Sequence, residues 1–259
     1  MIDKTIDLSN DIAIVTGATS GLGWRFSKLL AAQGAKVAIA GRRTDRLQTL
    51  AAEIEADGGR ALCVPTDMSD MAQVEALSET VTANLGLPTI LVNNAGIADG
   101  QLATKLDVAF IEQLIAVNLT GPFLLARDVA KRLIKAKKPG RIVNIASIAA
   151  YSYDGNGAAL YSTSKGAIAR MTETLAVEWA QFPINVNAIA PGIVKSEMTD
   201  FMAQRMQAGE QAEDFAAHTK RKRVPTPDFL DSTLLFLLDP KSHAVTGTVI
   251  KVDDGQQGR

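Results

Sequence analysis

Two side chains of complementary chemistry stand one helical turn apart in this sequence. Tyr161 and Lys165 occupy positions i and i+4 of the stretch YSTSK, so on a helix a phenol and an ammonium would project from one face. A free tyrosine has a pKa near ~10, too high for a base at neutral pH, and a fixed positive charge close by favours the tyrosinate. The pair could therefore give a proton to a carbonyl oxygen or take one from an alcohol. The same spacing is common on helix surfaces, so the pair has to be judged by its context.

A glycine-rich turn near the N-terminus could bind a phosphate group. The residues at 16–23 read TGATSGLG, follow an apolar run and lead into a stretch with helical periodicity. Glycines permit a tight turn, and backbone N–H groups at the start of a helix can face a pyrophosphate. The spacing is G-x-x-x-G-x-G instead of G-x-G-x-x-G, and such turns also merely join strands to helices. Because this turn follows an N-terminal strand, we interpret it as a dinucleotide-binding turn.

Two arginines stand where the second apolar run ends. Gly41 is followed by Arg42 and Arg43, at the position where an NAD-binding enzyme places Asp or Glu for the ribose 2′-hydroxyl. No acid is available there, and a guanidinium suits a 2′-phosphate through charge-assisted, bidentate hydrogen bonds. The alternative is a pair of solvated arginines at the start of the next helix. We favour phosphate recognition, so NADP(H) is expected as the cofactor in preference to NAD(H).

Short apolar runs alternate with longer amphipathic stretches, and these elements must position the residues above. The apolar runs are interpreted as strands buried on both faces: Ile12–Thr16, Lys36–Ala40, Ala61–Pro65, Ile90–Asn93, Arg141–Ala146, Asn185–Ala190 and Thr248–Asp253. The stretches between them are interpreted as helices, for example Leu22–Gln33, Asp45–Ala56, Ser69–Asn84, Phe110–Lys135 and Ser162–Gln181. The alternation predicts an α/β fold: one doubly wound domain over 1–259, with a seven-stranded parallel sheet and helices on both faces.

The polar segment 196–227 follows the end of the sixth predicted strand. Ligands of doubly wound sheets bind beyond the carboxyl ends of the strands, so this segment could form a lid over a substrate. A solvated helical excursion is an equally good interpretation.

Composition excludes several classes of function. The 259 residues carry 27 Lys and Arg against 28 Asp and Glu, a net charge of −1, which argues against nucleic-acid binding through bulk positive charge. The single cysteine, Cys63, can form no intrachain disulfide, and together with two histidines it offers too few ligands for the usual zinc site. The longest strongly apolar blocks, such as Leu234–Leu238, are too short to cross a bilayer, and the N-terminus lacks the apolar region of a signal peptide. We expect a cytoplasmic protein without a metal, a nucleic-acid partner or a membrane contact.

With these motifs in place, the sequence resembles the short-chain dehydrogenase/reductase family over about residues 10–255. The motifs follow the family's order: TGATSGLG at 16–23, Asp67 after the third strand, NNAG at 93–96, Asn118 within a helix, Ser147 after the fifth strand, Tyr161 with Lys165, and Pro191-Gly192 after the sixth strand. Each motif is modest alone, and the set is specific. By general appearance the nearest subgroup is the 3-oxoacyl-thioester reductase-like set.

The resemblance implies four catalytic residues and a Rossmann-like fold. Tyr161 would be the general acid/base, and Ser147 would hydrogen-bond the substrate carbonyl. Lys165 would bind the nicotinamide ribose and lower the pKa of the phenol. Asn118 would hold a water that connects Lys165 to solvent, although it could instead be a polar residue that bends its helix near Gly121 and Pro122.

The resemblance also implies the cofactor contacts. The glycine turn would line the pyrophosphate, Asp67 and Met68 would face the adenine, and Ile193 and Val194 would contact the nicotinamide carboxamide through backbone groups. Asn93 and Asn94 could be contacts or could cap strand-end carbonyls. The full set is Gly17, Ser20, Gly21, Leu22, Gly23, Arg42, Arg43, Asp67, Met68, Asn93, Asn94, Ala95, Gly96, Tyr161, Lys165, Pro191, Gly192, Ile193, Val194 and Ser196.

Two departures from the family pattern bear on substrate identity and subunit packing. Ser147 and Tyr161 are 14 positions apart, one more than the commonest family spacing, and the extra residue falls in 151–160, the expected wall of the substrate pocket. Asp254 stands where glycine is usual.

The resulting hypothesis is an NADP(H)-dependent oxidoreductase that interconverts a ketone and a secondary alcohol. The resemblance implies a homotetramer formed through the helices at 110–135 and 162–181, and a dimer stays open. One alternative is an NAD-linked dehydrogenase of a secondary alcohol or polyol, against which Arg42 argues. Another is a non-catalytic NADP(H)-binding sensor, whose mark would be a lost Tyr161 or Lys165, and both residues are retained.

Overall fold

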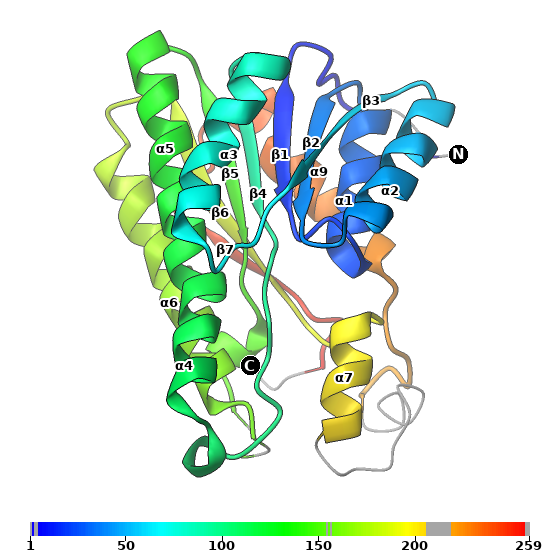
Figure 1. The fold of residues 1–259 in the computed structure, drawn as a ribbon, viewed down its shortest axis with the longest axis vertical. Helices are drawn as coiled ribbons and strands as arrows, with labels where there is room; N and C mark the ends of the chain where they lie inside the picture. Colours follow the sequence, from blue (N-terminus) through cyan, green and yellow to red (C-terminus); the bar gives the residue numbers. More distant parts are fainter. Residues whose placement is uncertain (1, 3–4, 154, 156, 206–218, 257–259) are drawn as a thin grey trace.

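The computed structural model describes residues 2, 5–153, 155, 157–205 and 219–256. Within these residues lies one sheet of seven parallel strands in the order β3-β2-β1-β4-β5-β6-β7 (Figure 1). The strands are β1 (Ile12–Thr16), β2 (Lys36–Gly41), β3 (Arg60–Pro65), β4 (Ile90–Asn93), β5 (Gly140–Ile145), β6 (Ile184–Pro191) and β7 (Val249–Val252). The strand order reverses between β1 and β4, the place where doubly wound sheets bind their ligands. The predicted fold class is therefore confirmed.

The helices and short turns of the described chain connect these strands. They are α1 (Gly21–Ala32), α2 (Thr44–Ala56), α3 (Met71–Asn84), η1 (Ala103–Lys105), α4 (Val108–Ile115), η2 (Ala116–Thr120), α5 (Gly121–Ala136), η3 (Ile148–Ala150), α6 (Ala159–Glu178), α7 (Glu197–Arg205), η4 (Pro227–Leu230), α9 (Asp231–Leu238) and η5 (Pro240–Ser242).

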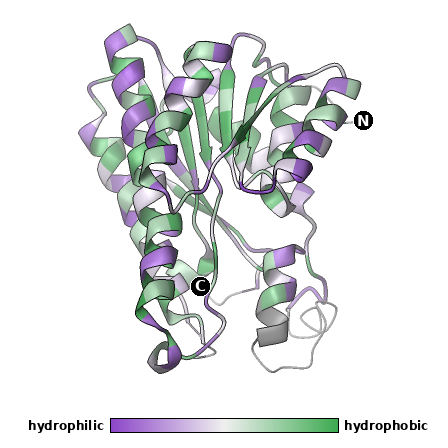
Figure 2. Cartoon of the chain, viewed as in Figure 1, coloured by the Kyte–Doolittle hydropathy of each residue, from purple (hydrophilic) through white to green (hydrophobic). Residues whose placement is uncertain are grey.

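Apolar strands are stable here because helices cover both faces of the sheet. Along β1, Ile14 packs into a core that it shares with α3, α5 and α6, whereas Ala13 and Val15 pack into a second core shared with α1, α2 and α9. Figure 1 shows the two helix layers on either side of the sheet, and Figure 2 shows hydrophobic strands between helices whose hydrophilic residues face outward. The sheet is thus a rigid support whose carboxyl edge stays free for a site.

The strands lie within one residue of their predicted ends, but the long predicted helix over 110–135 differs. It divides into α4, the single π-helical turn η2 and α5. The wide turn contains Asn118, which is buried and hydrogen-bonds outside its own helix. A polar side chain that leaves the regular ladder is a known cause of such irregularities. Helix α9 was not predicted either, because its apolar block is too short to show a helical period.

The helical stretch Val108–Ala136 is long and apolar enough, by length and composition, to cross a membrane, which the sequence analysis did not anticipate. Its most apolar window has a mean hydropathy of 1.6, and 33% of that window is buried. Core helices of water-soluble proteins pass the same test, and α5 packs here against α3 and into the core of the sheet. Length and composition are therefore weak evidence for a membrane span.

The expected lid begins beyond the carboxyl edge of the sheet as α7, which Figure 1 shows apart from the other helices. Its middle part, 206–218, lies outside the described residues. The last part contains Arg221 and Arg223, which form ion pairs with Asp254 after β7. The part of the segment that is described is therefore tied to the strand ends.

Candidate active site

A cavity of about 800 Å³ opens at the carboxyl edge of the sheet. Its walls come from residues at or just after the ends of β1 to β6, together with α4, η2, α7 and the first turns of α6. Most of the sequence-predicted site residues line it: Gly17, Ser20, Gly21, Leu22, Arg42, Arg43, Asp67, Met68, Asn94, Ala95, Gly96, Ser147, Tyr161, Lys165, Pro191, Gly192, Ile193, Val194 and Ser196. Gly23, Asn93 and Asn118 are not part of the lining.

The glycine turn presents backbone to the cavity at places where side chains would not fit. Gly17 and Gly21 have φ values of +66° and +53°, in the left-handed region that favours glycine. A Cβ at Gly17 would lie 2.8 Å from the Cα of Ala95, and one at Gly23 would lie 2.3 Å from the carbonyl oxygen of Gly17. Ser20 precedes α1, and its side chain makes no capping hydrogen bond to this helix. The bare turn and the N–H groups of the helix start form a cradle that fits a pyrophosphate.

Arginines gather beside this turn. The Arg43 guanidinium donates hydrogen bonds to the side chain of Thr19, at 3.0 Å from Nη2 and 3.2 Å from Nε, and lies 2.9 Å from the carboxylate of Glu197. Arg46 approaches the same carboxylate at 3.8 Å. Burial raises the pKa of the Glu197 carboxyl, but hydrogen bonds from Arg43 and Ser20 and the arginine charges outweigh it, so the pKa lies below its usual value. The Glu197 carboxylate is thus an anion of the chain itself that these arginines already bind.

Arg42, after β2, acts electrostatically on a second acid of the cavity wall, Asp67 after the neighbouring strand β3. Burial raises the pKa of the Asp67 carboxyl, but two hydrogen bonds from Ser69 and the charge of Arg42 bring it below its usual value. The backbone N–H of Ser69 donates to the Asp67 carboxylate at 2.9 Å, and its hydroxyl does so at 2.7 Å. Asp67 is therefore an ionised group with a fixed orientation at the cavity wall.

Ser147, Tyr161 and Lys165 meet at the inner end of the cavity. Ser147 follows β5 and hydrogen-bonds with the Tyr161 phenol from the first turn of α6. The Nζ of Lys165 lies 5.7 Å from the centroid of the Tyr161 ring and donates to the carbonyl oxygen of Ile145 at 2.8 Å. Phenol and ammonium therefore share one face of α6, in keeping with their spacing.

Burial dominates the acid–base properties of this group. It raises the pKa of the Tyr161 phenol; the hydrogen bond with Ser147 lowers it, and the negative charge of Asp99 raises it. Burial also lowers the pKa of Lys165 to about 8. The structure therefore differs from the expected lowering of the phenol pKa by Lys165, because enclosure disfavours the charged form of both groups. The phenol is protonated at neutral pH, the form that can donate a proton.

Asn118 fixes the wall behind these residues. Its Oδ1 accepts from the backbone N–H of Ile97 at 2.9 Å, and its Nδ2 donates to the carbonyl of Ile97 at 2.9 Å and to the Ser164 hydroxyl at 3.0 Å. A Cβ at Gly96 would lie 3.5 Å from Asn118 Oδ1 and 3.4 Å from Lys165 Nζ. Asn118 therefore connects the loop after β4 with α6 and lies close to the lysine.

The other predicted amides have structural partners as well. Asn93 Nδ2 donates to Asn144 Oδ1 at 2.9 Å beneath the cavity, and Asn94 Nδ2 donates to the carbonyl of Thr16 at 2.8 Å. The backbone N–H and carbonyl of Ile193, expected to contact a carboxamide, are both bonded to the side-chain amide of Gln256, at 2.5 and 2.9 Å. Val194 keeps its place in the cavity lining.

Three residues of this region were missed by the sequence analysis: Asp99, Glu197 and Gln256. Asp99 has no side-chain exposure, and its carboxylate accepts backbone hydrogen bonds from α6. No local pattern marks any of the three, since each contacts an element distant in sequence. Only the tertiary fold reveals them.

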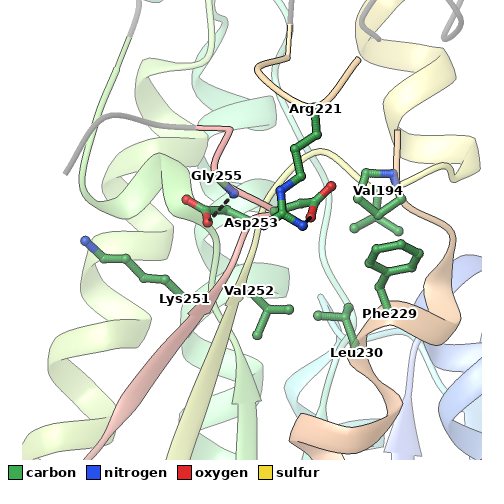
Figure 3. A pocket seen from close by; sticks show the side chains of 10 residues that line it. Val194, Arg221, Phe229, Leu230, Lys251, Val252, Asp253 and Gly255 are labelled. Carbon is green, nitrogen blue, oxygen red and sulfur yellow. Dashed lines mark hydrogen bonds and ion pairs between the residues drawn. The ribbon is translucent and has the colours of Figure 1, made fainter. Parts of the chain in front are cut away.

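A second, smaller cavity of about 300 Å³ lies next to the described end of the expected lid. Figure 3 shows Arg221 and Phe229 on one side of it and the residues after β7 on the other. Arg221 and Arg223 both pair with Asp254, at 3.0 and 2.6 Å. In the described chain, no group of three or more His, Cys, Asp or Glu side chains is placed to hold a metal ion.

Comparisons with known proteins agree on one family. Residues 11–207 match the family described as short chain dehydrogenase. The chain is 34% identical to 3-oxoacyl-[acyl-carrier-protein] reductase of Synechocystis sp., with 96% of this chain and 97% of the relative covered. It is also 34% identical to galactitol 2-dehydrogenase of Agrobacterium fabrum, with 96% and 98% covered. A crystal structure of actinorhodin polyketide ketoreductase with NADPH superposes with a TM-score of 0.91 at 29% identity, covering 98% of this chain and 100% of that one.

Proposed function

The chain belongs to the short-chain dehydrogenase family of oxidoreductases, and on that premise we propose that it interconverts a ketone and a secondary alcohol with NADP(H), using Tyr161 as the general acid/base. The observation that carries this proposal is the meeting of Ser147, Tyr161 and Lys165 in one cavity with the glycine turn. A non-catalytic sensor would not need a protonated phenol, a hydroxyl and an ammonium at the same place.

The proposed chemistry divides among these side chains. The Ser147 hydroxyl would hydrogen-bond the substrate oxygen and stabilise the negative charge that develops there. Tyr161 would donate its proton to that oxygen in the reductive direction and recover it from the alcohol in the reverse direction. Lys165 is charged at neutral pH, since its pKa is about 8, and its ammonium would stabilise the tyrosinate left after proton donation. Asn118 would hold the loop at Gly96 against α6, behind the three catalytic side chains.

A nicotinamide cofactor, when bound, supplies or accepts the hydride. The residues that would hold it are those of the bare glycine turn, Asp67 and Met68 at the adenine end, and Val194 with Ser196 at the nicotinamide end. Arg42 and Arg43 would bind a 2′-phosphate, because both line the cavity at the end of β2. Lys165 would contact the nicotinamide ribose.

The test is a panel of 3-oxoacyl thioesters, cyclic ketones and polyols with both cofactors, followed through the absorbance of the reduced nicotinamide. We expect turnover with NADPH and a ketone, and loss of roughly 10²–10⁴-fold in kcat/KM for Tyr161→Phe. Ser147→Ala should lose about 10²–10³-fold, as other donors to an oxyanion do. If Tyr161→Phe kept most of the turnover, the acid/base assignment would be wrong.

One observation favours the alternative of an NAD-linked polyol or alcohol dehydrogenase. The Arg43 guanidinium is paired with Glu197, which reduces the positive charge that a 2′-phosphate would meet. Arg42 forms no ion pair within the described residues, so it stays the better candidate for phosphate recognition. Equal catalytic efficiency with both cofactors would support the alternative.

We also propose a homotetramer formed through α4–α5 and α6, with a dimer as the other outcome. Large apolar side chains are exposed on these helices: Val108 at 69%, Phe123 at 43% and Val177 at 78%. Contact with a second copy would cover such side chains. Sedimentation at micromolar concentration tests this, and a monomer would contradict it. The single domain, the lid and the cytoplasmic location remain predictions.

A further inference from the structure

The N-terminus of α6, the helix that carries Tyr161, is capped by a carboxylate from another part of the chain. Ala158 precedes the helix and offers no side-chain cap. Instead, Asp99 Oδ2 accepts the N–H of Leu160 at 3.1 Å, and Oδ1 accepts the N–H of Tyr161 at 3.4 Å. A helix start exposes unpaired N–H groups and positive potential, so an acid there stabilises it. The backbone of Tyr161 is therefore held by Asp99 directly.

Asp99 is buried to an unusual degree for an acid, at 0% exposure. It forms no ion pair in the part of the chain that the structure describes, so its charge rests on the two amides and the helix end. A buried carboxylate without such partners would be strongly unfavourable. Asp99 does not line the cavity, whereas its neighbour Ala98 does. Its carboxylate thus acts on Tyr161 from behind and cannot touch a substrate.

The loop that carries Asp99 is fixed against the chain before α6. Gly157, with φ at +82°, approaches the backbone of Gln101 so closely that a Cβ there would lie 2.9 Å from the Gln101 carbonyl carbon. The N–H of Gly157 donates to the Tyr153 hydroxyl at 3.2 Å. The loop that carries Asp99 is therefore packed tightly against the segment before α6.

We propose that Asp99 is a positioning residue for Tyr161: its carboxylate fixes the first turn of α6 and adds a negative charge to the surroundings of the phenol. The proposal rests on the proposed function for its catalytic meaning, and on the hydrogen bonds for its geometry. The titratable and polar groups that act on the phenol are Ser147, which hydrogen-bonds it, Lys165 on the same helix, and Asp99, whose carboxylate lies at the start of that helix. Of these, Asp99 supplies the negative charge, and it raises the pKa of Tyr161.

Titration of tyrosine absorbance tests the electrostatic part without any substrate. The chain has three tyrosines, so subtracting the curve of Tyr161→Phe from that of the parent isolates the phenol of Tyr161. Asp99→Asn keeps the shape of the side chain, removes its charge and leaves one of its two acceptor oxygens in place. We expect the Tyr161 phenol to ionise at lower pH in this variant, with circular dichroism confirming the fold at each pH. An unmoved titration would overturn the electrostatic role.

The matched control is Asp70→Asn. Asp70 also caps a helix, since its carboxylate accepts from the N–H groups of Ala72 at 3.0 Å and Gln73 at 3.2 Å, but α3 contributes no cavity residue. Removing the charge of Asp70 should leave the pH at which the Tyr161 phenol ionises unchanged. A shift of equal size in both variants would mean that net charge, and not the place of Asp99, is responsible.

Enzyme kinetics tests the positioning part. In Asp99→Asn the basic limb of the kcat/KM profile for ketone reduction should move to lower pH, because the phenol loses its proton sooner. Asp99→Ala removes both acceptors and should lower kcat/KM by roughly ten- to hundredfold, as small misplacements of catalytic groups do. Full activity and an unmoved pH profile in Asp99→Ala would refute positioning. If no substrate were turned over while the titration shifted as expected, the proposed function would fail and the effect of Asp99 on the phenol would stand.

Discussion

The carboxylate of Glu197 lies 2.9 Å from the guanidinium of Arg43, and both side chains line the large cavity. Glu197 begins α7 after β6, whereas Arg43 precedes α2 after β2, so the ion pair connects two segments across the carboxyl edge of the sheet. A 2′-phosphate and this carboxylate need the same kind of donors. Glu197 therefore competes with the phosphate that we propose Arg42 and Arg43 to bind.

Glu197→Gln should strengthen the binding of NADPH and leave the binding of NADH nearly unchanged. Both partners are about half exposed, at 45% and 54%, so the ion pair contributes about 1 kcal/mol or less, and the gain in affinity should be at most about fivefold. Calorimetric titration with each cofactor measures it. Asp200→Asn, in the same turn of α7, removes an equal charge without touching the arginines and serves as the control. An equal gain for both cofactors would contradict competition with the phosphate.

Arg42→Asp should narrow or invert the preference for NADPH over NADH. The substitution removes a charge-assisted donor and places an acid where NAD-binding chains carry one. Hydrogen bonds to charged groups are worth about 1.5–3 kcal/mol, so the ratio of the kcat/KM values should fall by roughly ten- to a hundredfold. Arg42→Lys keeps the charge and loses the bidentate geometry, so its ratio of kcat/KM values should lie between those of the parent and Arg42→Asp. A ratio that did not change in Arg42→Asp would show that this arginine is only solvated.

The sheet could be predicted from sequence almost to the residue, because strands buried on both faces are continuous apolar runs. The glycine turn and the i, i+4 spacing of Tyr161 and Lys165 are local patterns too, and the cavity contains both. The division of the helix at Asn118 has no such pattern, because it depends on hydrogen bonds to Ile97 and Ser164, distant in sequence.

The electrostatics of the site could not be predicted for the same reason. The spacing of Tyr161 and Lys165 predicts a lowered pKa for the phenol only if both groups remain solvated. Burial raises the pKa of the phenol instead, and the negative charge that also raises this pKa comes from Asp99, 62 positions away. Glu197 likewise meets Arg43 only in the folded chain. Sequence periodicity predicts helices and strands, whereas the charges that surround a side chain in the folded protein can be assigned only from its three-dimensional structure.

Asp254→Gly should loosen the described end of the expected lid without unfolding the protein. Asp254 has φ at +53°, which glycine adopts freely, so the backbone is preserved while the carboxylate that pairs with Arg221 and Arg223 is lost. The N–H of Arg223, bonded to the Thr219 hydroxyl at 3.1 Å, should exchange its hydrogen faster, while the melting temperature changes little. Asp254→Asn keeps a side chain of the same shape and should have the same effect. Unchanged exchange in both variants would show that the ion pairs do not hold this segment.

Lys165 should make the stability of the protein depend on pH in the alkaline range. Burial lowers its pKa from 10.5 to about 8, so between these values the unfolded chain binds more protons than the folded one, and the free energy of unfolding must rise with pH. Below pH 8 the full penalty of the buried charge is present. The difference in the free energy of unfolding between the parent and Lys165→Met should therefore grow in favour of the parent, on the order of 1–3 kcal/mol, when urea unfolding is compared at neutral and alkaline pH. Lys138→Met, at an exposed lysine, should show a constant difference. A constant difference for Lys165→Met as well would mean that its ammonium is solvated in the folded protein, and the lowering of the Lys165 pKa by burial would be wrong.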